Sequence, residues 1–143
     1  MKNFKLNEKD ILSNQDWTFP TTTYYGPGRF NEIAKFCEEF DIKNPLIVTD
    51  SGSKDLPFIK KLIALLSKNN IKSDLFYNIS PNPRDDEISK GCDQFKNGSH
   101  DSIIAIGGGS AMDGGKSICL TVNSETPLWD FEFEQPVPKI TKE

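Results

Sequence analysis

The chain has 143 residues, of which 36% are hydrophobic and 27% are charged, a composition typical of a folded domain rather than of a disordered chain. The net charge of -4 argues against nucleic acids and membrane surfaces as partners, because the sequence offers no basic face. No apolar run approaches the ~20 residues of a membrane span, and the N-terminus lacks the apolar segment of a signal peptide. We therefore expect a cytoplasmic protein.

Apolar, β-branched runs alternate with amphipathic segments along the chain, which is the pattern of βαβ units. A short extended stretch at 21–26 ends in a Gly-Pro-Gly turn. The elements expected after it are a helix at 29–40, a strand at 45–50, a helix at 57–70, a strand at 72–78, a helix at 82–95, a strand at 102–106 and a helix at about 111–122. This order predicts an α/β fold with a parallel sheet and flanking helices.

The predicted domain covers residues 1–122, and residues 123–143 form a tail with prolines and aromatic residues but no clear helical period. We interpret this tail as connecting chain. The helix at 82–95 has a complete start signal, with Asn82 as N-cap, Pro83 in the first helical position and acidic residues behind it. The three cysteines, far apart and odd in number, predict buried free thiols rather than a disulfide framework.

The glycine-rich stretch GGGSAMDGGKS at 107–117 directly follows the strand at 102–106. It is not a P-loop, because Ser110 stands where that motif needs a glycine, and it is not G-x-G-x-x-G, because Met112 replaces the third glycine. Glycines between a strand and a helix still leave backbone N–H groups free for a phosphate, and Ser110 adds a hydroxyl. A tight turn explains one glycine, whereas three in a row (Gly107, Gly108 and Gly109) favour a phosphate site.

Two features of the following helix have more than one interpretation. Asp113, expected in its first turn, either pairs with Lys116 on the helix surface or contacts a ligand. Gly114 and Gly115 each cost ~1 kcal/mol relative to alanine within a helix. Something therefore approaches this helix closely, and the sequence leaves open whether it is a ligand or backbone.

Two more polar residues stand at predicted strand ends, where α/β sheets bind ligands. Asp50 is either a partner for a ribose or the cap of the turn that follows it, and spacing alone favours the cap. Asn82, too, is either a ligand contact or the N-cap described above, and the N-cap explains it equally well. His100, the only histidine, precedes the strand at 102–106 at its opposite end, so a histidine-rich metal site within this chain is excluded.

The stretch AIGGGSAMDGGKSI at 105–118 resembles the GGGS-x-x-D-x-x-K signature of the iron-containing alcohol dehydrogenase family. The resemblance extends over nearly the whole chain. TTTYYGPGRFNEI is similar to the strand and Gly-x-Gly turn with which the family's domain begins, LIVTDSG to its second strand end, and SPNPRDDEISKG to its Pro-Asn-Pro element. The order and spacing of four elements make the resemblance specific.

The resemblance implies a Rossmann-like N-terminal domain that binds a dinucleotide. Gly107 to Ser110 would bind the pyrophosphate of the cofactor, Asp50 would accept hydrogen bonds from the adenosine ribose, and Asn82 would contact the adenosine side. Asp113 would lie nearer the nicotinamide. These roles reverse the preference for Asp50 as a turn cap, since the family's fold brings that strand end beside the glycine loop. The ribose contact also implies NAD rather than NADP.

The family's C-terminal half is helical and holds a divalent metal through an aspartate and three histidines, and the chain stops short of it. We therefore expect the NAD-binding portion of an oxidoreductase that passes hydride between an alcohol, or its aldehyde, and NAD, with iron or zinc only in a full-length member. No catalytic or metal-binding residue is assigned to this chain, and alone it is expected to be inactive. The surfaces that face the absent half, with Trp129, Phe131 and Phe133, are expected to be exposed and to favour either self-association, as in a homo-oligomer, or capture of a partner. Alternatives are a stand-alone nucleotide-binding module and a relative of glycerol dehydrogenase.

Overall fold

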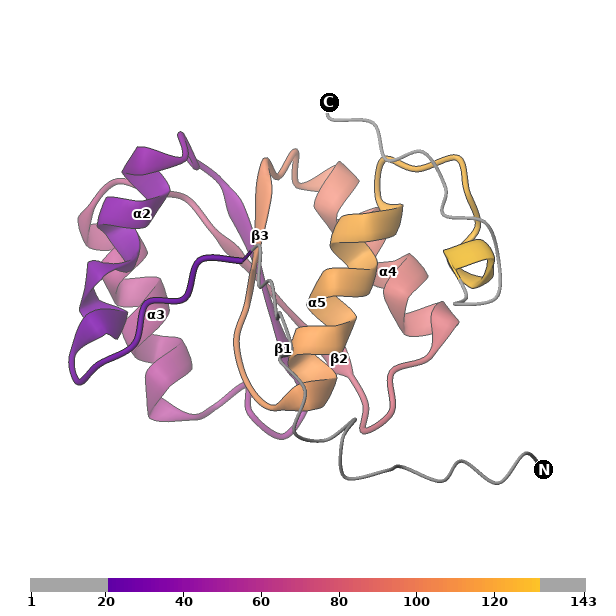
Figure 1. Cartoon of the computed structure of the whole chain (residues 1–143), viewed down its shortest axis with the longest axis horizontal. Coiled ribbons are helices and arrows are strands. Elements are labelled where there is room, and N and C mark those ends of the chain that lie inside the picture. Colours follow the sequence, from indigo (N-terminus) through magenta and orange to yellow (C-terminus); the bar gives the residue numbers. More distant parts are fainter. Residues whose placement is uncertain (1–20, 132–143) are drawn as a thin grey trace, which may run out of the picture.

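A computed structural model of the chain describes residues 21–131 (Figure 1). Its sheet has three parallel strands in the order β2-β1-β3. The strands are β1 (Pro45–Asp50), β2 (Asp74–Ile79) and β3 (Ser102–Ala105). The helices are η1 (Arg29–Glu32), α2 (Ile33–Glu39), α3 (Pro57–Lys68), α4 (Asp85–Asn97), α5 (Gly109–Thr121) and η2 (Leu128–Phe131), where η marks a 3-10 helix. The predicted Rossmann-like α/β fold is confirmed.

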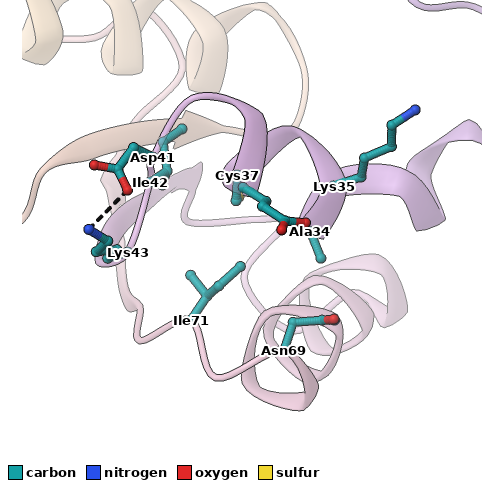
Figure 2. Close-up of a pocket in the computed structure, with 9 residues that line it drawn as sticks. Ala34, Lys35, Cys37, Asp41, Ile42, Lys43, Asn69 and Ile71 are labelled. Carbon is teal, nitrogen blue, oxygen red and sulfur yellow. Dashed lines mark ion pairs between the residues drawn. The ribbon is translucent and has the colours of Figure 1, made fainter.

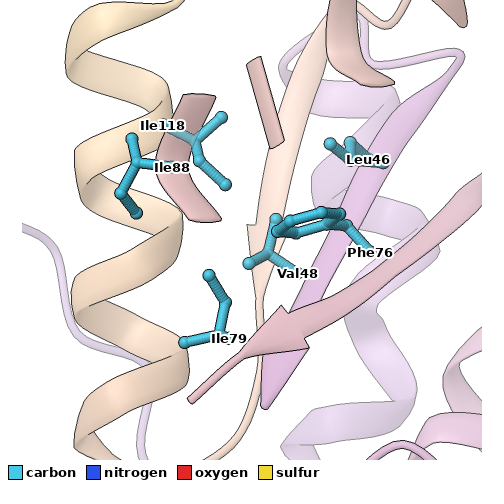
Figure 3. Packing of buried hydrophobic residues seen from close by; sticks show 6 residues of the cluster. All are labelled: Leu46, Val48, Phe76, Ile79, Ile88 and Ile118. Atoms are coloured by element: carbon cyan, nitrogen blue, oxygen red, sulfur yellow. The ribbon is translucent and has the colours of Figure 1, made fainter. Parts of the chain in front are cut away.

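The helices form a layer on each side of the sheet, with α2 and α3 on one face and α4 and α5 on the other (Figure 1). The central strand β1 is buried on both faces, which is why it reads as a continuous apolar run. Its side chains alternate between two cores. Leu46 and Val48 pack with Ile118 of α5 and with the other residues shown in Figure 3. Ile47 packs on the opposite face against α2 and α3.

Several element boundaries differ from the sequence predictions. Residues 29–32 form a 3-10 helix instead of the first turn of an α-helix, and no strand is present at 21–26. The helix expected from 82 begins at Asp85, and the one expected from about 111 begins at Gly109. The cysteines are free as predicted, but only Cys37 is buried, while Cys119 is exposed on α5. Among the helices of residues 21–131, none has the length and apolar character needed to cross a membrane.

Candidate functional site

The candidate site lies where the three parallel strands end and their connecting loops begin. Asp50 ends the central strand β1, and Gly107 follows the neighbouring strand β3. Oδ2 of Asp50 lies 3.0 Å from the position that a Cβ on Gly107 would occupy. At the other side of β1, the N–H of Ser51 donates to the carbonyl of Ile79 at 3.0 Å, which ties the ends of β1 and β2 together. The fold therefore unites residues that are far apart in the sequence.

Gly107 is required by the fold itself. Its φ of 143° lies in a region that side chains with a Cβ rarely adopt. A Cβ there would also lie 2.8 Å from the Cβ of Ala111, closer than two carbons can pack. Gly107 thus makes the sharp exit from β3 toward α5 and is explained without a ligand.

Gly108 and Gly109 are not explained in this way. Gly108 has an extended backbone, with φ -79° and ψ -170°, which any residue can adopt. A Cβ at either position would meet no atom within 4 Å. Both glycines stand at the N-terminus of α5, where the first backbone N–H groups lack helical partners and the helix dipole is positive. The absent side chains leave the backbone accessible to an anion such as a phosphate.

Gly114 and Gly115 pack α5 against the sheet. A Cβ on Gly114 would lie 2.8 Å from Cδ1 of Ile79, and one on Gly115 would lie 2.5 Å from the Cβ of Ala105. These contacts answer the question that the sequence left open, because strands β2 and β3 make the close approach. The two helix glycines are therefore structural.

Asp50 caps the turn that follows it, which is one of the two roles considered from the sequence. Its Oδ1 accepts hydrogen bonds from the backbone N–H groups of Gly52 and Ser53, each at 3.0 Å, so it does cap the following turn. Both of these bonds end on Oδ1, while Oδ2 faces Gly107. One carboxylate oxygen fixes the side chain, and the other is directed at the glycine loop.

Asn82 is not the N-cap of α4, and that prediction is wrong. Its φ of 58° is left-handed, whereas an N-cap has an extended backbone, which Arg84 supplies with φ -112° and ψ 156°. The helix start is displaced because Glu87 accepts the backbone N–H of Arg84 at 3.2 Å. Asn82 is exposed at the tip of the loop after β2, at the same edge of the sheet as Asp50.

Glu87 is a buried, hydrogen-bonded carboxylate at the base of the loop that carries Asn82, and the sequence analysis missed it. Burial raises the pKa of its carboxyl, but hydrogen bonds from Ser80 and Arg84 outweigh burial and hold the pKa below its ordinary value. The carboxylate is therefore charged at neutral pH. The sequence pattern that could have indicated this role is the capping-box spacing from Arg84 to Glu87. It is hard to recognise because arginine is not one of the usual N-cap residues.

Asp113 is the fifth residue of α5 rather than part of its first turn, because the helix begins at Gly109. Its Oδ1 lies 3.9 Å from Nζ of Lys116, and both side chains are largely exposed. The surface pair considered from the sequence is therefore present, although such exposed pairs contribute little to stability. Ser110 lies in the first turn of α5 and is partly buried.

Thr49 is a second residue that the sequence analysis missed. It precedes Asp50 in β1 and is 0% exposed, and its Oγ1 has no hydrogen-bond partner among the described residues. Oγ1 lies 3.4 Å from the position of a Cβ on Gly107. A buried hydroxyl without a partner is uncommon in folded proteins, and this one sits beneath the glycine loop.

The amino ends of the strands carry different features. His100 is buried there, and its Nδ1–H donates to the carbonyl of Asn44 at 2.9 Å. A cavity of about 520 Å³ also lies at this end, between α2, the residues before β1 and the end of α3 (Figure 2). Within residues 21–131, no group of three or more histidine, cysteine or acidic residues could hold a metal ion. Because His100 and the cavity lie at the amino ends of the strands, neither belongs to the candidate site.

A Rossmann-like sheet with a glycine loop at the carboxyl ends of its strands defines a class of nucleotide-binding domain. Within that class, the profile of the family described as iron-containing alcohol dehydrogenase matches residues 20–142. The chain belongs to this family, as the resemblance in the sequence implied.

Several enzymes resemble this chain. Alcohol dehydrogenase 4 of Schizosaccharomyces pombe is 34% identical over 113 residues, which cover 79% of this chain and 27% of the relative. NADH-dependent butanol dehydrogenase A of Clostridium acetobutylicum is 32% identical over 89% of this chain and 32% of its own length. The chain therefore spans about a third of the curated relatives it matches.

Solved structures agree with this assignment. A 1,3-propanediol oxidoreductase matches with a TM-score of 0.76 and 28% identity, over 81% of this chain and 30% of that one. Sulfoacetaldehyde reductase from Bifidobacterium kashiwanohense, solved in complex with NAD⁺, matches with a TM-score of 0.74 and 25% identity. That match covers 85% of this chain and 32% of the reductase.

Proposed function

We propose that this chain binds NAD and forms the cofactor-binding portion of an alcohol dehydrogenase. The observation that carries the proposal is the pair Gly108 and Gly109, whose missing side chains no contact within the fold explains. A pyrophosphate is the part of a dinucleotide that needs such access, at the N-terminus of a helix. Family membership supports the proposal, and one similar structure was solved with NAD⁺.

The residues present fit such a cofactor. The first N–H groups of α5 and the hydroxyl of Ser110 would receive the pyrophosphate. Oδ2 of Asp50 would accept from a ribose hydroxyl, while Oδ1 keeps the side chain in place. Asn82 would meet the adenosine side from the loop after β2, and Asp113 would lie toward the nicotinamide. When bound, the nicotinamide supplies the hydride acceptor or donor.

An alcohol or aldehyde is the substrate proposed for a full-length member, together with iron or zinc. Among residues 21–131, no cluster of three or more histidine, cysteine or acidic side chains could hold that metal. A homo-oligomer and a cytoplasmic location also remain proposals. A glycerol dehydrogenase relative and a stand-alone module stay as alternatives, and the second would bind NAD without serving any dehydrogenase.

The test is calorimetric titration of NAD into the Gly109→Val variant. A branched side chain would occupy the space where the phosphate must approach, yet its Cβ would have no neighbouring atom of the fold within 4 Å. We expect the variant to fold, as judged by circular dichroism, and to lose at least about tenfold in affinity, or ~1.4 kcal/mol.

Cys119→Val is the matched control, because it places the same side chain at an exposed position further along α5. It should bind NAD like the unmodified chain. Undiminished affinity in a folded Gly109→Val variant would mean that the glycine loop does not hold the cofactor.

A further inference from the structure

The loop from Ser80 to Arg84 carries Asn82 to the edge of the candidate site. It connects β2 to α4, and its first residue follows Ile79, whose carbonyl accepts the N–H of Ser51 at the end of β1. The loop therefore starts from a point that is tied to the strand carrying Asp50. What holds its far end determines where Asn82 stands.

One buried carboxylate oxygen holds both ends of this loop. Oε2 of Glu87 accepts the backbone N–H of Ser80 at 3.2 Å, the hydroxyl of Ser80 at 3.1 Å and the backbone N–H of Arg84 at 3.2 Å. Glu87 is only 7% exposed, so water competes weakly for these bonds. Hydrogen bonds to a charged acceptor are the stronger kind, and here they close the loop at its base.

The tip of the loop is stiff between these two anchors. Asn82 stands between Pro81 and Pro83, whose rings fix their own backbone angles. Asn82 itself takes the left-handed backbone at φ 58° and is exposed. With the base closed by Glu87 and the tip restrained by two prolines, the backbone of Asn82, and with it the direction of its Cα–Cβ bond, is restrained before any ligand arrives.

We propose that Glu87 is a positioning residue of the dinucleotide site, which acts by holding the Ser80–Arg84 loop so that Asn82 is preorganised for the adenosine side of the cofactor. This inference rests on the function proposed above. Glu87 does not touch the ligand, since its carboxylate is directed at Ser80 and Arg84. Preorganisation lowers the cost of ordering the loop on binding, so its loss weakens affinity.

A double-mutant cycle separates positioning from a general structural role. NAD affinity is measured by calorimetry for Asn82→Ala, Glu87→Ala and the double variant. If Glu87 acts through Asn82, each single change costs about tenfold and the double variant binds no more weakly than Asn82→Ala. If Glu87 merely stabilises the helix, its cost persists in the Asn82→Ala background, and additive losses overturn the inference.

Two further variants and one further probe distinguish the possible outcomes. Glu87→Gln keeps a carbonyl oxygen that can accept the two backbone N–H groups, so it should restore most of the affinity. Asp93→Ala removes an exposed carboxylate from the same helix and should change nothing. Inorganic pyrophosphate, a probe of the glycine loop alone, should bind all variants equally.

Amide hydrogen exchange tests, without any cofactor, whether Glu87 restrains the Ser80–Arg84 loop. The N–H groups of Ser80 and Arg84 should exchange faster in Glu87→Ala than in the unmodified chain, while those of β1 stay protected. Unchanged exchange at both amides overturns the inference. Failure of the unmodified chain to bind NAD overturns instead the proposed function, and this inference with it, whereas intact binding with an additive cycle overturns the inference alone.

Discussion

The glycines at 107, 108 and 109 are adjacent, yet the fold requires glycine only at the first of these positions. Gly107 has a positive φ and no room for a Cβ, whereas a Cβ on Gly108 or Gly109 would meet no atom within 4 Å. Only the last two are free to serve a ligand without a cost to folding. At the residue scale, the proposed cofactor site accounts for the two glycines that the fold itself does not require.

The two carboxylate oxygens of Asp50 make different contacts, so its turn cap can be separated experimentally from the ribose contact proposed for it. Asp50→Asn keeps an oxygen that can accept from Gly52 and Ser53, but it removes the negative charge that would repel a 2′-phosphate. We expect this variant to fold normally and to lose most of its preference for NAD over NADP, measured by calorimetry. Asp50→Gly should relax the preference and also destabilise the turn. Equal binding of both cofactors by the unmodified chain would contradict the role of Asp50.

Thr49 is a position where a substitution should raise the stability of the fold, because its buried hydroxyl has no partner among the described residues. Thr49→Val replaces that hydroxyl with a methyl group of similar shape, so the desolvation cost of the unpaired group disappears. We expect the free energy of unfolding to rise by about 1 kcal/mol, measured as a higher denaturant midpoint at an unchanged slope. Thr49→Ser, which keeps the hydroxyl, should show no such gain. A lower midpoint for Thr49→Val would mean that the hydroxyl does make a stabilising bond.

At the scale of elements, α5 is placed by its contacts with the sheet. It crosses both β1 and β3 closely, and the glycines on its inner face allow this approach. The distance between helix and sheet also sets where the N-terminus of α5 lies relative to Asp50. A helix that stood further out would move its free N–H groups away from the ends of the strands.

Gly115→Ala tests this packing. Alanine is favoured over glycine within a helix by about 1 kcal/mol, so an unpacked helix would gain stability. Here the new methyl group would lie 2.5 Å from the Cβ of Ala105, and the overpacking should outweigh the gain. We expect a net loss of about 1–2 kcal/mol in the free energy of unfolding, followed by thermal melting. Gly108→Ala, which meets no atom, is the control, and a more stable Gly115→Ala variant would argue against close packing.

At the scale of the whole molecule, the chain corresponds to about a third of its curated relatives. Its candidate site has residues suited to hold a cofactor, on one edge of a sheet, and no metal-binding group within residues 21–131. Trp129 is exposed on η2, and its Nε1 lies 3.4 Å from Asp85 of α4, while Leu128 packs against the core. Phe131 is partly buried, and Phe133 lies outside the described residues.

We predict that the 143-residue chain alone binds NAD weakly and shows no alcohol dehydrogenase activity. Polarisation of an alcohol oxygen by a Lewis acid needs metal ligands, and His100, the only histidine, lies at the far end of the sheet. The measurement is NADH formation with a panel of short alcohols and added iron or zinc. Turnover that survives chelation and controls for contaminating enzymes would show that residues assigned here to structure carry the chemistry.

The sequence by itself determined the fold class, because the alternation of apolar runs and amphipathic segments depends only on local periodicity. It also located the glycine loop, since strand, glycines and helix are contiguous along the chain. Only the tertiary structure decided which glycines the fold requires and which it does not, because that depends on the atoms that a Cβ at each position would contact. It likewise moved the start of α4 from Asn82 to Asp85, because the carboxylate of Glu87 holds both ends of the loop. Contacts between distant parts of the fold can override a local capping signal, and the local sequence pattern does not show when they do so.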